Sequence, residues 1–203
     1  MKELPINLRG GSLQVERSLF QVGKGGAVPT SPQQLELKEI RRELARECFR
    51  TWHYLGDTGY ISTFDIGIFY GGRLWGAISL GCPNATDMKG MYSRYTQKGW
   101  WEIKRLALSD DLPKNSESRV IAISLRLLRK YRKVCGVITY ADDGVGHSGT
   151  IYKASGFEYR GLTAAKSDFF EEGKDKPKQR GITKGLKGEW KPRSRKHLFI
   201  KIF

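Results

Sequence analysis

Residues 141–161 read ADDGVGHSGTIYKASGFEYRG and join a polar, glycine-rich loop to a short helix that ends at a glycine. Gly156 stands where a helix C-terminus favours a left-handed residue, and Phe157 then begins a strand. The preceding run, VCGVITYA, is compact and apolar, as a buried strand is. The polar loop therefore lies between a strand and a helix, which is where α/β proteins usually hold a ligand.

Upstream of this stretch the sequence predicts a hairpin and a helix. Two alternating apolar runs, 64–70 and 73–80, flank a Gly-Gly pair, and a type I′ turn needs positive φ at both of its central residues. We therefore expect two antiparallel strands. Ser31 and Pro32 are a typical helix start, and the apolar residues that follow recur at helical spacing, so a helix is expected over 31–50.

The strand predicted over WWEIKRLALSDD changes the parity of its apolar residues. Trp101 and Ile103 occupy odd positions, whereas Leu106 and Leu108 occupy even ones. A β-bulge near residues 104–105 would shift the alternation by one residue. A strand buried on both faces is the alternative, because both of its faces carry apolar side chains.

The elements in chain order predict one mixed α/β domain. A long helix is expected over 115–131, and KHLFIKIF is expected to form the last strand. Residues 1–30 are interpreted as an N-terminal arm and residues 31–203 as the domain. Within that domain, residues 166–195 are interpreted as a basic insertion before the last strand.

The chain carries a formal net charge of +15, and residues 173–203 hold eleven Lys or Arg against two acids. Such an excess indicates partners rather than a fold, and nucleic acid is the first candidate, with a solvated basic tail as the alternative. No apolar run reaches the ~18 residues of a membrane helix, the N-terminus lacks the apolar centre of a secretory signal, and the three cysteines are scattered. A cytoplasmic protein without membrane partners is expected.

The motif YKASGF resembles the tyrosine-to-Gly-Phe pattern found where the fourth helix meets the sixth strand of the GNAT acyltransferase fold. This resemblance implies a central twisted sheet with flanking helices, a splayed strand at the bulge, and a coenzyme A donor. One feature departs from the GNAT pattern. The helix after the bulged strand begins in LPKNSESRVIAISL, without the Arg/Gln-x-x-Gly-x-Gly/Ala turn whose backbone amides hold the coenzyme A pyrophosphate.

Together with TWHYLG and YADDGVGHSGTIY, that departure makes the chain similar to the Mom DNA-modification proteins of Mu-like bacteriophages over about residues 35–203. The resemblance implies a transferase that converts adenine in phage DNA to N6-carbamoylmethyladenine and so protects that DNA from host restriction in the bacterial cytoplasm. The alternatives are an acetyl-CoA-dependent N-acetyltransferase, against which the missing glycines argue, and a non-catalytic nucleic-acid-binding module on a GNAT fold. The polar cluster at 140–152 argues against the second alternative.

Proton transfer is predicted for the polar loop. Asp142 or His147 is the expected base, with Asp143 beside them, although loop acids also form turns and a histidine there can cap a helix. His53 follows a tryptophan in a polar loop, where a lone histidine is often structural, and the resemblance favours a site role. The predicted catalytic set is Asp142, His147, His53, Tyr152 and Arg105.

Donor binding is predicted at the start of the long helix and on the bulged strand. A helix N-terminus with hydroxyl groups and an arginine can hold a phosphate or an acyl oxygen, while Asn and Ser there also serve as helix caps. The two interpretations are compatible. The predicted donor-binding set is Asn115, Ser116, Ser118, Arg119, Leu106 and Leu108.

DNA contacts are predicted for aromatic residues that could stack on an extruded base and for basic residues near the C-terminus. Tyr140 and Tyr152 have core packing as their alternative. The predicted DNA-binding set is Tyr54, Tyr140, Lys191, Arg193, Arg195 and Lys196. An iron site through His53, His147 and Asp142 would have a suitable ligand set, but its spacing matches no known signature, so no metal is expected.

The implied product also bears on the donor. Attack of adenine N6 on an activated glycine gives N6–CO–CH2–NH2, an isomer of N6–CH2–CO–NH2, and migration of its free amine to ring C6 would convert the first into the second. Glycyl-tRNA is therefore a candidate donor, held in part by Arg119 and residues 166–195, whereas acetyl-CoA is the usual donor of the fold. The sequence leaves open whether the protein is a monomer or a homodimer.

Overall fold

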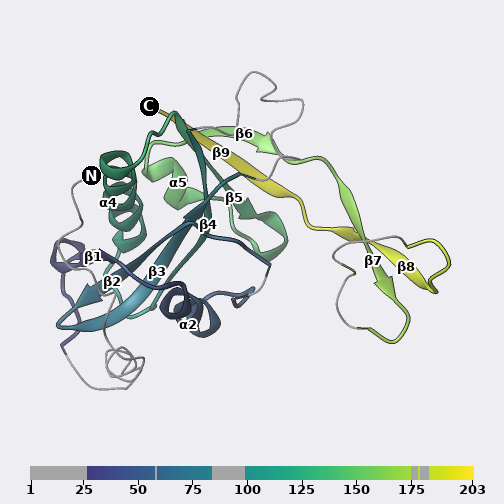
Figure 1. Cartoon of the computed structure of the whole chain (residues 1–203), viewed down its shortest axis with the longest axis horizontal. Coiled ribbons are helices and arrows are strands. Elements are labelled where there is room, and N and C mark those ends of the chain that lie inside the picture. Colours follow the sequence, from purple (N-terminus) through teal and green to yellow (C-terminus); the bar gives the residue numbers. More distant parts are fainter. Residues whose placement is uncertain (1–26, 58, 84–98, 175–177, 179–182) are drawn as a thin grey trace. The chain divides into compact units, whose positions relative to one another are not determined.

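The computed structural model describes residues 27–57, 59–83, 99–174, 178 and 183–203 (Figure 1). The chain divides into two compact units, one within residues 1–138 together with 201–203 and the other within 139–200. Both units contain strands and helices, so the mixed α/β class expected from the sequence is confirmed. Residues 1–26 of the expected N-terminal arm lie outside the described residues.

The first unit is organised around a hairpin of β2 (Phe64–Tyr70) and β3 (Arg73–Gly81). Gly71 and Gly72 join the strands with φ angles of 58° and 75°, the left-handed conformations that a type I′ turn requires. The hairpin predicted from the Gly-Gly pair is confirmed. Strand β4 (Trp100–Leu108) pairs antiparallel with the free side of β3.

The predicted β-bulge is present in β4. Two consecutive residues of β3 face residues of β4 that are two positions apart, since Ser79 lies opposite Arg105 and Leu80 lies opposite Ile103. Lys104 is therefore the extra residue of the bulge. The bulge explains the sequence pattern, because apolar residues of odd parity before Lys104 and of even parity after it fall on the same face of the sheet.

The helix predicted over 31–50 is wrong in its first half. Ser31 caps a short 3-10 helix, η1 (Pro32–Gln34), and strand β1 (Glu36–Glu39) follows and pairs antiparallel with β2. Helix α2 (Arg42–Trp52) begins only after this strand. In the misassigned segment, Leu35 and Leu37 alternate with the charged residues Glu36 and Lys38, and the edge of the sheet stabilises this period of two as a strand.

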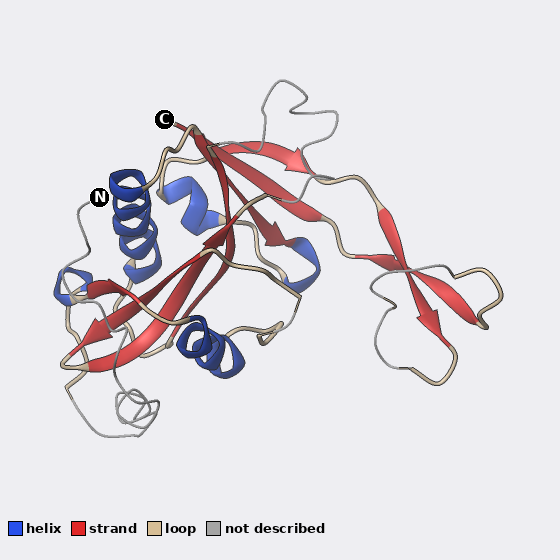
Figure 2. Cartoon of the chain, in the orientation of Figure 1, coloured by secondary structure: helices blue, strands red, loops and turns tan. Residues whose placement is uncertain are grey.

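The sheet of the first unit is covered by helices on both faces (Figure 2). Helix α2 packs on the face that carries Phe69, Ala77 and Ala107, and α4 (Ser116–Tyr131) covers the other face with an apolar stripe, as its sequence predicts. The buried residues of the α2 layer are Ile40, Leu44, Ala45, Cys48, Phe49, Phe69, Leu74, Ala77 and Ala107. Burial in this layer raises the pKa of the Cys48 thiol far above its ordinary value.

Strand β5 (Gly136–Asp142) is the strand expected from VCGVITYA. Its residues 136–138 pair in parallel with residues 100–102 of β4, before the bulge, which gives the order β1-β2-β3-β4-β5 in the first unit. The last residue of the chain also belongs here, because the backbone N–H of Phe203 donates to the carbonyl of Cys135 at 3.1 Å.

The second unit contains α5 (Thr150–Ala154), β6 (Glu158–Leu162) and the final strand β9 (Lys196–Ile202), close to the elements predicted from the sequence. Strands β6 and β9 pair antiparallel. Gly156 has φ of 74° just after α5, as a helix-ending glycine should. A short 3-10 helix, η2 (Asp143–Val145), forms the front of the polar loop.

The expected basic insertion is a second hairpin. Strands β7 (Lys166–Glu171) and β8 (Gly188–Arg193) pair antiparallel over six residues and form a two-stranded sheet of their own. The sequence did not predict these strands, because Phe169 and Phe170 are adjacent rather than alternating. In Figure 1 this ribbon extends from the end of the second unit where β9 begins.

Two glycines of the second unit, Gly149 and Gly146, allow a matched test of how Phe199 packs. Gly149 has φ of 72°, and a Cβ there would lie 2.2 Å from the Phe199 ring, whereas Gly146 has φ of 76° with no atom within 4 Å of such a Cβ. Gly149→Ala therefore combines left-handed strain of about 1–2 kcal/mol with overpacking of about 1–3 kcal/mol. We expect a loss of about 2–5 kcal/mol in urea unfolding, against about 1–2 kcal/mol for Gly146→Ala; equal losses would contradict the packing of Phe199 over Gly149.

Candidate functional site

In the first unit, the bulge aligns three polar side chains across three strands on the face that α2 covers. Asp65 of β2 lies opposite Ser79 of β3, and Ser79 lies opposite Arg105 of β4. The neighbouring row on this face is apolar, with Ala77 opposite Ala107. The layer beneath α2 therefore turns polar at the bulge, and this polar row is the first candidate site.

The Asp65 carboxylate is buried and is held by two serine hydroxyls. Ser62 Oγ donates to Oδ2 at 2.9 Å, and Ser79 Oγ donates to Oδ1. Burial raises the pKa of Asp65 above its ordinary value, while the two serine hydrogen bonds act against that rise. A carboxyl with a raised pKa is suited to proton transfer. Sequence reasoning missed this residue, since FDIGIFY is typical of an ordinary buried strand.

Arg105, a predicted catalytic residue, is partly buried on β4, and Ser79 of β3 lies between it and Asp65. Its guanidinium carbon lies 5.4 Å from the ring centroid of Tyr60, and its Nη1 donates to the carbonyl of Lys104 at 3.0 Å. Burial also raises the pKa of Tyr60. A guanidinium that is fixed in this way can hold an anion or stabilise a developing oxyanion.

The bulge also carries a buried ion pair. Lys104 Nζ lies 2.6 Å from Glu102 Oε2, and both side chains are nine-tenths or more buried. Burying two charges is costly even when they are paired, so such a pair is weak evidence for stability. Its position places charged groups next to the polar row of Asp65, Ser79 and Arg105.

His53 and Tyr54, both predicted site residues, lie directly after α2 in the first unit. The backbone N–H of His53 donates to the carbonyl of Phe49, and its Nδ1 accepts from the N–H of Leu55 at 3.1 Å. A neutral His53 ring therefore carries its proton on Nε2. Tyr54 stacks on the His53 ring at 4.7 Å and is 48% exposed, so this pair presents an aromatic face to solvent.

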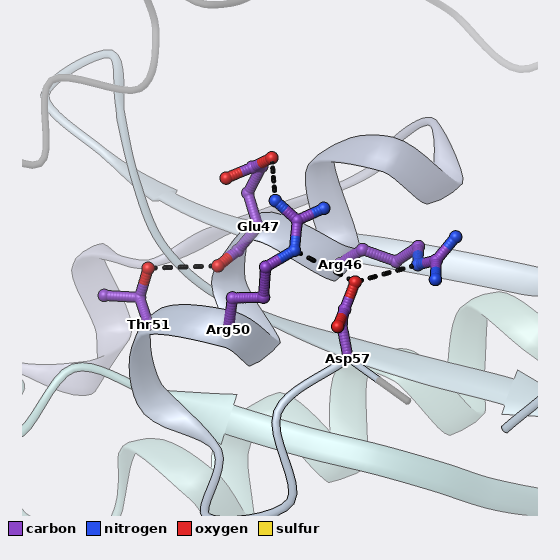
Figure 3. Close-up of polar contacts among 5 residues, drawn as sticks. All are labelled: Arg46, Glu47, Arg50, Thr51 and Asp57. Atoms are coloured by element: carbon purple, nitrogen blue, oxygen red, sulfur yellow. Dashed lines mark hydrogen bonds and ion pairs between the residues drawn. The ribbon is translucent and has the colours of Figure 1, made fainter. Parts of the chain in front are cut away.

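The loop that carries His53 and Tyr54 is fastened to α2 by Asp57 (Figure 3). Oδ2 of Asp57 accepts from Nε of Arg50 at 2.9 Å and from Nε of Arg46 at 3.1 Å. Arg50 also pairs with Glu47. Chiefly because of the Arg50 hydrogen bond, the pKa of Asp57 is lowered, so the carboxylate stays ionised and the loop stays fastened at neutral pH.

The predicted donor site at the start of α4 has an unusual backbone. Asn115 occupies the N-cap with φ of 72° and makes no side-chain capping bond, so the capping interpretation fails for its side chain. It is the only non-glycine residue with positive φ among the residues described. The buried Ser116 hydroxyl donates to the carbonyl of Pro113 at 2.6 Å, and Arg119 donates to the carbonyl of Gln33 at 3.2 Å.

The other three predicted donor-binding residues lie on α4 and β4. Ser118 is partly exposed on the first turn of α4, and Leu106 and Leu108 lie opposite Ile78 and Gly76 on β3. All six residues of the predicted set therefore belong to the first unit, together with His53, Tyr54 and Arg105.

In the second unit, the predicted bases Asp142 and His147 lie on one tight turn. Oδ1 of Asp142 accepts from the N–H of Gly144 at 3.0 Å, and the carbonyl of Asp142 accepts from the N–H of His147 at 3.1 Å. The imidazole of His147 is exposed. Asp142 thus forms the turn, in accord with its alternative interpretation, and its catalytic role stays a prediction.

Beside this turn lies a hydrogen-bonded chain that the sequence did not reveal. Asp143 Oδ1 lies 3.1 Å from His197 Nε2, and His197 Nδ1 lies 2.9 Å from Tyr159 Oη. The three residues come from η2, β9 and β6. The available signal was that His197 is one of three histidines, but its contacts depend on the register of β6 against β9.

Tyr152 and Tyr140, predicted to contact an extruded base, lie in the second unit. Tyr152 is only 8% exposed and packs against Phe157 at 5.9 Å and Phe199 at 5.5 Å, which is the position of a core aromatic. Tyr140 is partly buried on β5. The surroundings of Tyr152 therefore match its alternative interpretation as a packing residue.

The four basic residues predicted to bind DNA follow one another along β8 and the start of β9. Lys191 pairs with Glu189 at 2.6 Å, and Arg193 makes a two-point ion pair with Asp168 across the ribbon. Arg195 donates to the carbonyl of Thr163 at 2.8 Å, and the backbone N–H of Lys196 donates to Thr163 Oγ1. Trp190, on the same strand, is 61% exposed and packs edge-on against Phe169.

No group of three or more His, Cys, Asp or Glu side chains is placed to hold a metal ion within the described residues. Of the trio considered for iron, His53 belongs to the first unit, whereas His147 and Asp142 belong to the second. In the same part of the chain, no helix is long and apolar enough to span a membrane.

Comparison with known proteins identifies related sequences and folds. Residues 34–200 match the sequence profile of the Mom protein family. The curated relative "Methylcarbamoylase mom" of Escherichia phage Mu is 32% identical over 150 residues, which cover 73% of this chain and 61% of the relative. The match therefore spans about three fifths of the length of that relative.

Solved structures show the fold. An IAA acetyltransferase from Bacillus cereus superposes with a TM-score of 0.54 at 11% identity, covering 83% of this chain and 99% of that one. An aminoglycoside acetyltransferase in complex with coenzyme A superposes with a TM-score of 0.51 at 14% identity, covering 83% and 94%. The fold is that of the GNAT acetyltransferases, as YKASGF and the bulged strand predicted.

The anchor at Asp57 yields a test that does not depend on activity. Asp57→Asn removes the negative charge that both arginines contact and so weakens both contacts. The amides of Leu55 and Gly56, which donate to His53, should then exchange hydrogen roughly two to five times faster at pH 7. The pKa of Asp57 in the folded protein is lowered from its ordinary value of 3.8. The contribution of its carboxylate to holding the loop is therefore fully present above pH 3.8 and is lost as the pH falls through the lowered pKa.

Wild type and Asp57→Asn should therefore converge only in acid below pH 3.8. Glu47→Gln is the matched control, because it removes the other partner of Arg50 and leaves Asp57 in place. Equal exchange rates in wild type and Asp57→Asn at pH 7, measured by NMR, would show that Asp57 does not fasten the loop.

Proposed function

The chain belongs to the Mom protein family, and on that premise we propose that it is a transferase that converts adenine in DNA to N6-carbamoylmethyladenine and so protects phage DNA from host restriction. The observation that carries the proposal is the match over residues 34–200, together with a relative named methylcarbamoylase. The acetyltransferase fold is consistent with transfer of an acyl-type group.

The reaction makes three demands on the protein. Adenine N6 is paired inside a duplex, so the base must be extruded and held, for which the exposed Tyr54 stacked on His53 is suited. N6 must lose a proton during attack, and the donor carbonyl then develops negative charge. Asp142 or His147 is the proton acceptor that the sequence predicts, and Arg105 is the proposed stabiliser of that charge.

Two candidate donors are consistent with the fold, but they differ in the product that they give. Acetyl-CoA is the usual donor of GNAT enzymes, and the coenzyme A complex of the aminoglycoside enzyme supports such binding by the fold. Direct acetyl transfer would give N6–CO–CH3, which is not carbamoylmethyladenine. Glycyl-tRNA would supply all atoms of the added group, and we propose that Arg119 and the basic residues within 166–195 contact it.

The bonds balance in the glycyl route. Adenine N6 attacks the glycyl ester carbonyl, an N–C bond forms, and the ester C–O bond breaks to release the tRNA hydroxyl. The free glycyl amine then attacks ring C6 and displaces the original nitrogen, which becomes the terminal amide. The glycine nitrogen ends bonded to C6, and no oxidant or reductant is required.

Nucleosides from DNA of bacteria that express the chain should contain carbamoylmethyladenine when analysed by mass spectrometry. Arg105→Ala should lower its amount by about 100-fold, because one stabiliser of a developing oxyanion is removed. DNA from cells with the empty vector is the control. Plain adenine with the wild-type chain present would contradict the proposed activity, and acetyladenine would favour the N-acetyltransferase alternative.

The donor is tested with purified protein, DNA and one donor at a time. With tRNA charged with glycine labelled at both carbons and the nitrogen, all three labels should appear together in the modified adenine, and the labelled nitrogen should be bonded to C6. Uncharged tRNA plus free labelled glycine is the matched control. Modification that proceeds on acetyl-CoA after removal of tRNA would rule out the glycyl route.

DNA binding by the C-terminal basic residues predicts a change in salt dependence. Replacing Lys191, Arg193, Arg195 and Lys196 by Ala should weaken binding to all duplexes similarly and flatten the slope of log K against log salt by about 0.9 for each phosphate that the variant no longer neutralises. The matched control removes four exposed charges of α4 and the residues just after it, Arg126, Arg129, Lys130 and Lys133. An unchanged slope in the first variant, or an equal weakening in the control, would contradict a role of this segment.

A further inference from the structure

The strongest unassigned feature of the second unit is the chain of Asp143, His197 and Tyr159. Its two hydrogen bonds measure 3.1 Å and 2.9 Å, and both ring nitrogens of His197 take part. The histidine side chain is mostly buried, with 19% of its surface exposed, whereas Tyr159 is 42% exposed. The chain thus leads from a surface phenol through a sheltered imidazole to a carboxylate.

The chemistry of the end groups fixes the direction of the protons. An ionised Asp143 can only accept, so Nε2 of His197 carries the proton of the first bond. In a neutral imidazole Nδ1 is then an acceptor, and it receives the hydroxyl proton of Tyr159. The phenol oxygen therefore gives its own proton inward, which leaves that oxygen suited to accept another.

Asp143 and Tyr159 are held in place by contacts outside the relay. The backbone N–H of Asp143 donates to the carbonyl of Arg195 at 3.1 Å, and its carbonyl accepts from Gly146. The Tyr159 ring packs 5.3 Å from Phe199, with the ammonium of Lys153 lying 5.5 Å from its centroid. Relays act well only when such contacts fix their geometry.

We propose that these three residues are a proton relay for the transferase, in which Tyr159 is the catalytic residue that touches the amino group of the nucleic acid, and His197 and Asp143 position and charge-balance it. The proposal rests on the proposed function and replaces Asp142 and His147 as the proton acceptor. Oδ1 of Asp142 is already an acceptor for the turn, whereas the phenol of Tyr159 has a base directly behind it.

The step balances in protons and charge. As the substrate nitrogen bonds to the donor carbonyl carbon, its N–H bond breaks and the proton passes to Tyr159 Oη. The phenol proton moves to Nδ1 of His197, and the resulting imidazolium is stabilised by the carboxylate of Asp143. The imidazolium afterwards returns its proton to water, and no redox change occurs.

The surroundings favour a substrate that carries phosphate. The ammonium of Lys153 lies over the Tyr159 ring, and Arg195 and Lys196 directly precede His197 in the sequence. These cations attract an anionic backbone beside the phenol. The acceptor class is therefore an amino group on a nucleic acid, in accord with adenine N6.

The kinetic test uses the full chain with DNA and the donor that supports modification. Tyr159→Phe should lower kcat by about 100-fold, as removal of a general base does, and should leave KM for DNA unchanged. The kcat of His197→Ala should fall by a similar factor, and imidazole in the buffer should restore part of that variant's rate. Tyr131→Phe and Asp110→Asn are the matched controls and should retain wild-type rates.

A raised KM with unchanged kcat in Tyr159→Phe, or no rescue of His197→Ala by imidazole, would overturn the relay. If the wild type itself leaves adenine unmodified, the proposed function fails instead, so the two failures are distinguishable. A second measurement is independent of activity: nitrogen NMR should show His197 protonated on Nε2 with Nδ1 as acceptor. A ring protonated only on Nδ1 would overturn the relay whatever the rates are.

Discussion

The single extra residue in β4 is the constraint on which the first unit depends. By inserting Lys104 between Ile103 and Arg105, the bulge keeps the apolar residues on either side of it in one core face and sets Arg105 in line with Ser79 and Asp65. Without the extra residue, the pleat would place Ile103 and Arg105 on the same face of the sheet. Either Ile103 would then leave its apolar face, or Arg105 would be placed on that apolar face. The polar row beneath α2 is thus a direct consequence of register.

A polar row inside a core is stable only when each of its members has partners. Asp65 is hydrogen-bonded by two serines, Arg105 rests on Tyr60, and Lys104 is paired with Glu102. An apolar core of the same shape would be at least as stable, since desolvation offsets most of what such pairs contribute. Polar groups kept at this cost, at one end of an otherwise apolar layer, make this row a candidate site.

Local signals decided which parts of the fold could be predicted. The Gly71-Gly72 turn, the parity change at Lys104 and the stripe of α4 each lie within a few residues and were interpreted correctly. The segment before α2 has an apolar pattern that fits a helix or a strand, and only its pairing with β2 decides between them. The β7–β8 ribbon joins residues far apart in sequence, as does the contact of His197 with Tyr159 and Asp143. The turn at Asp142 was therefore predictable from the sequence, and the hydrogen bonds among Asp143, His197 and Tyr159 were not.

The start of α4 shows why the missing glycines do not settle the donor. Asn115 adopts φ of 72°, a conformation that glycine reaches freely and that Asn tolerates better than most residues, so this turn retains one glycine-like backbone geometry without a glycine. Two side chains predicted to hold the donor are engaged elsewhere, since Ser116 donates to Pro113 and Arg119 donates to Gln33. A donor held at this end of the helix would therefore contact the backbone amides, the helix dipole and the N–H groups that Arg119 does not donate to Gln33, rather than the Ser116 hydroxyl. Backbone amides recognise phosphate in coenzyme A and in tRNA alike, so the choice between these donors rests on contacts outside this turn.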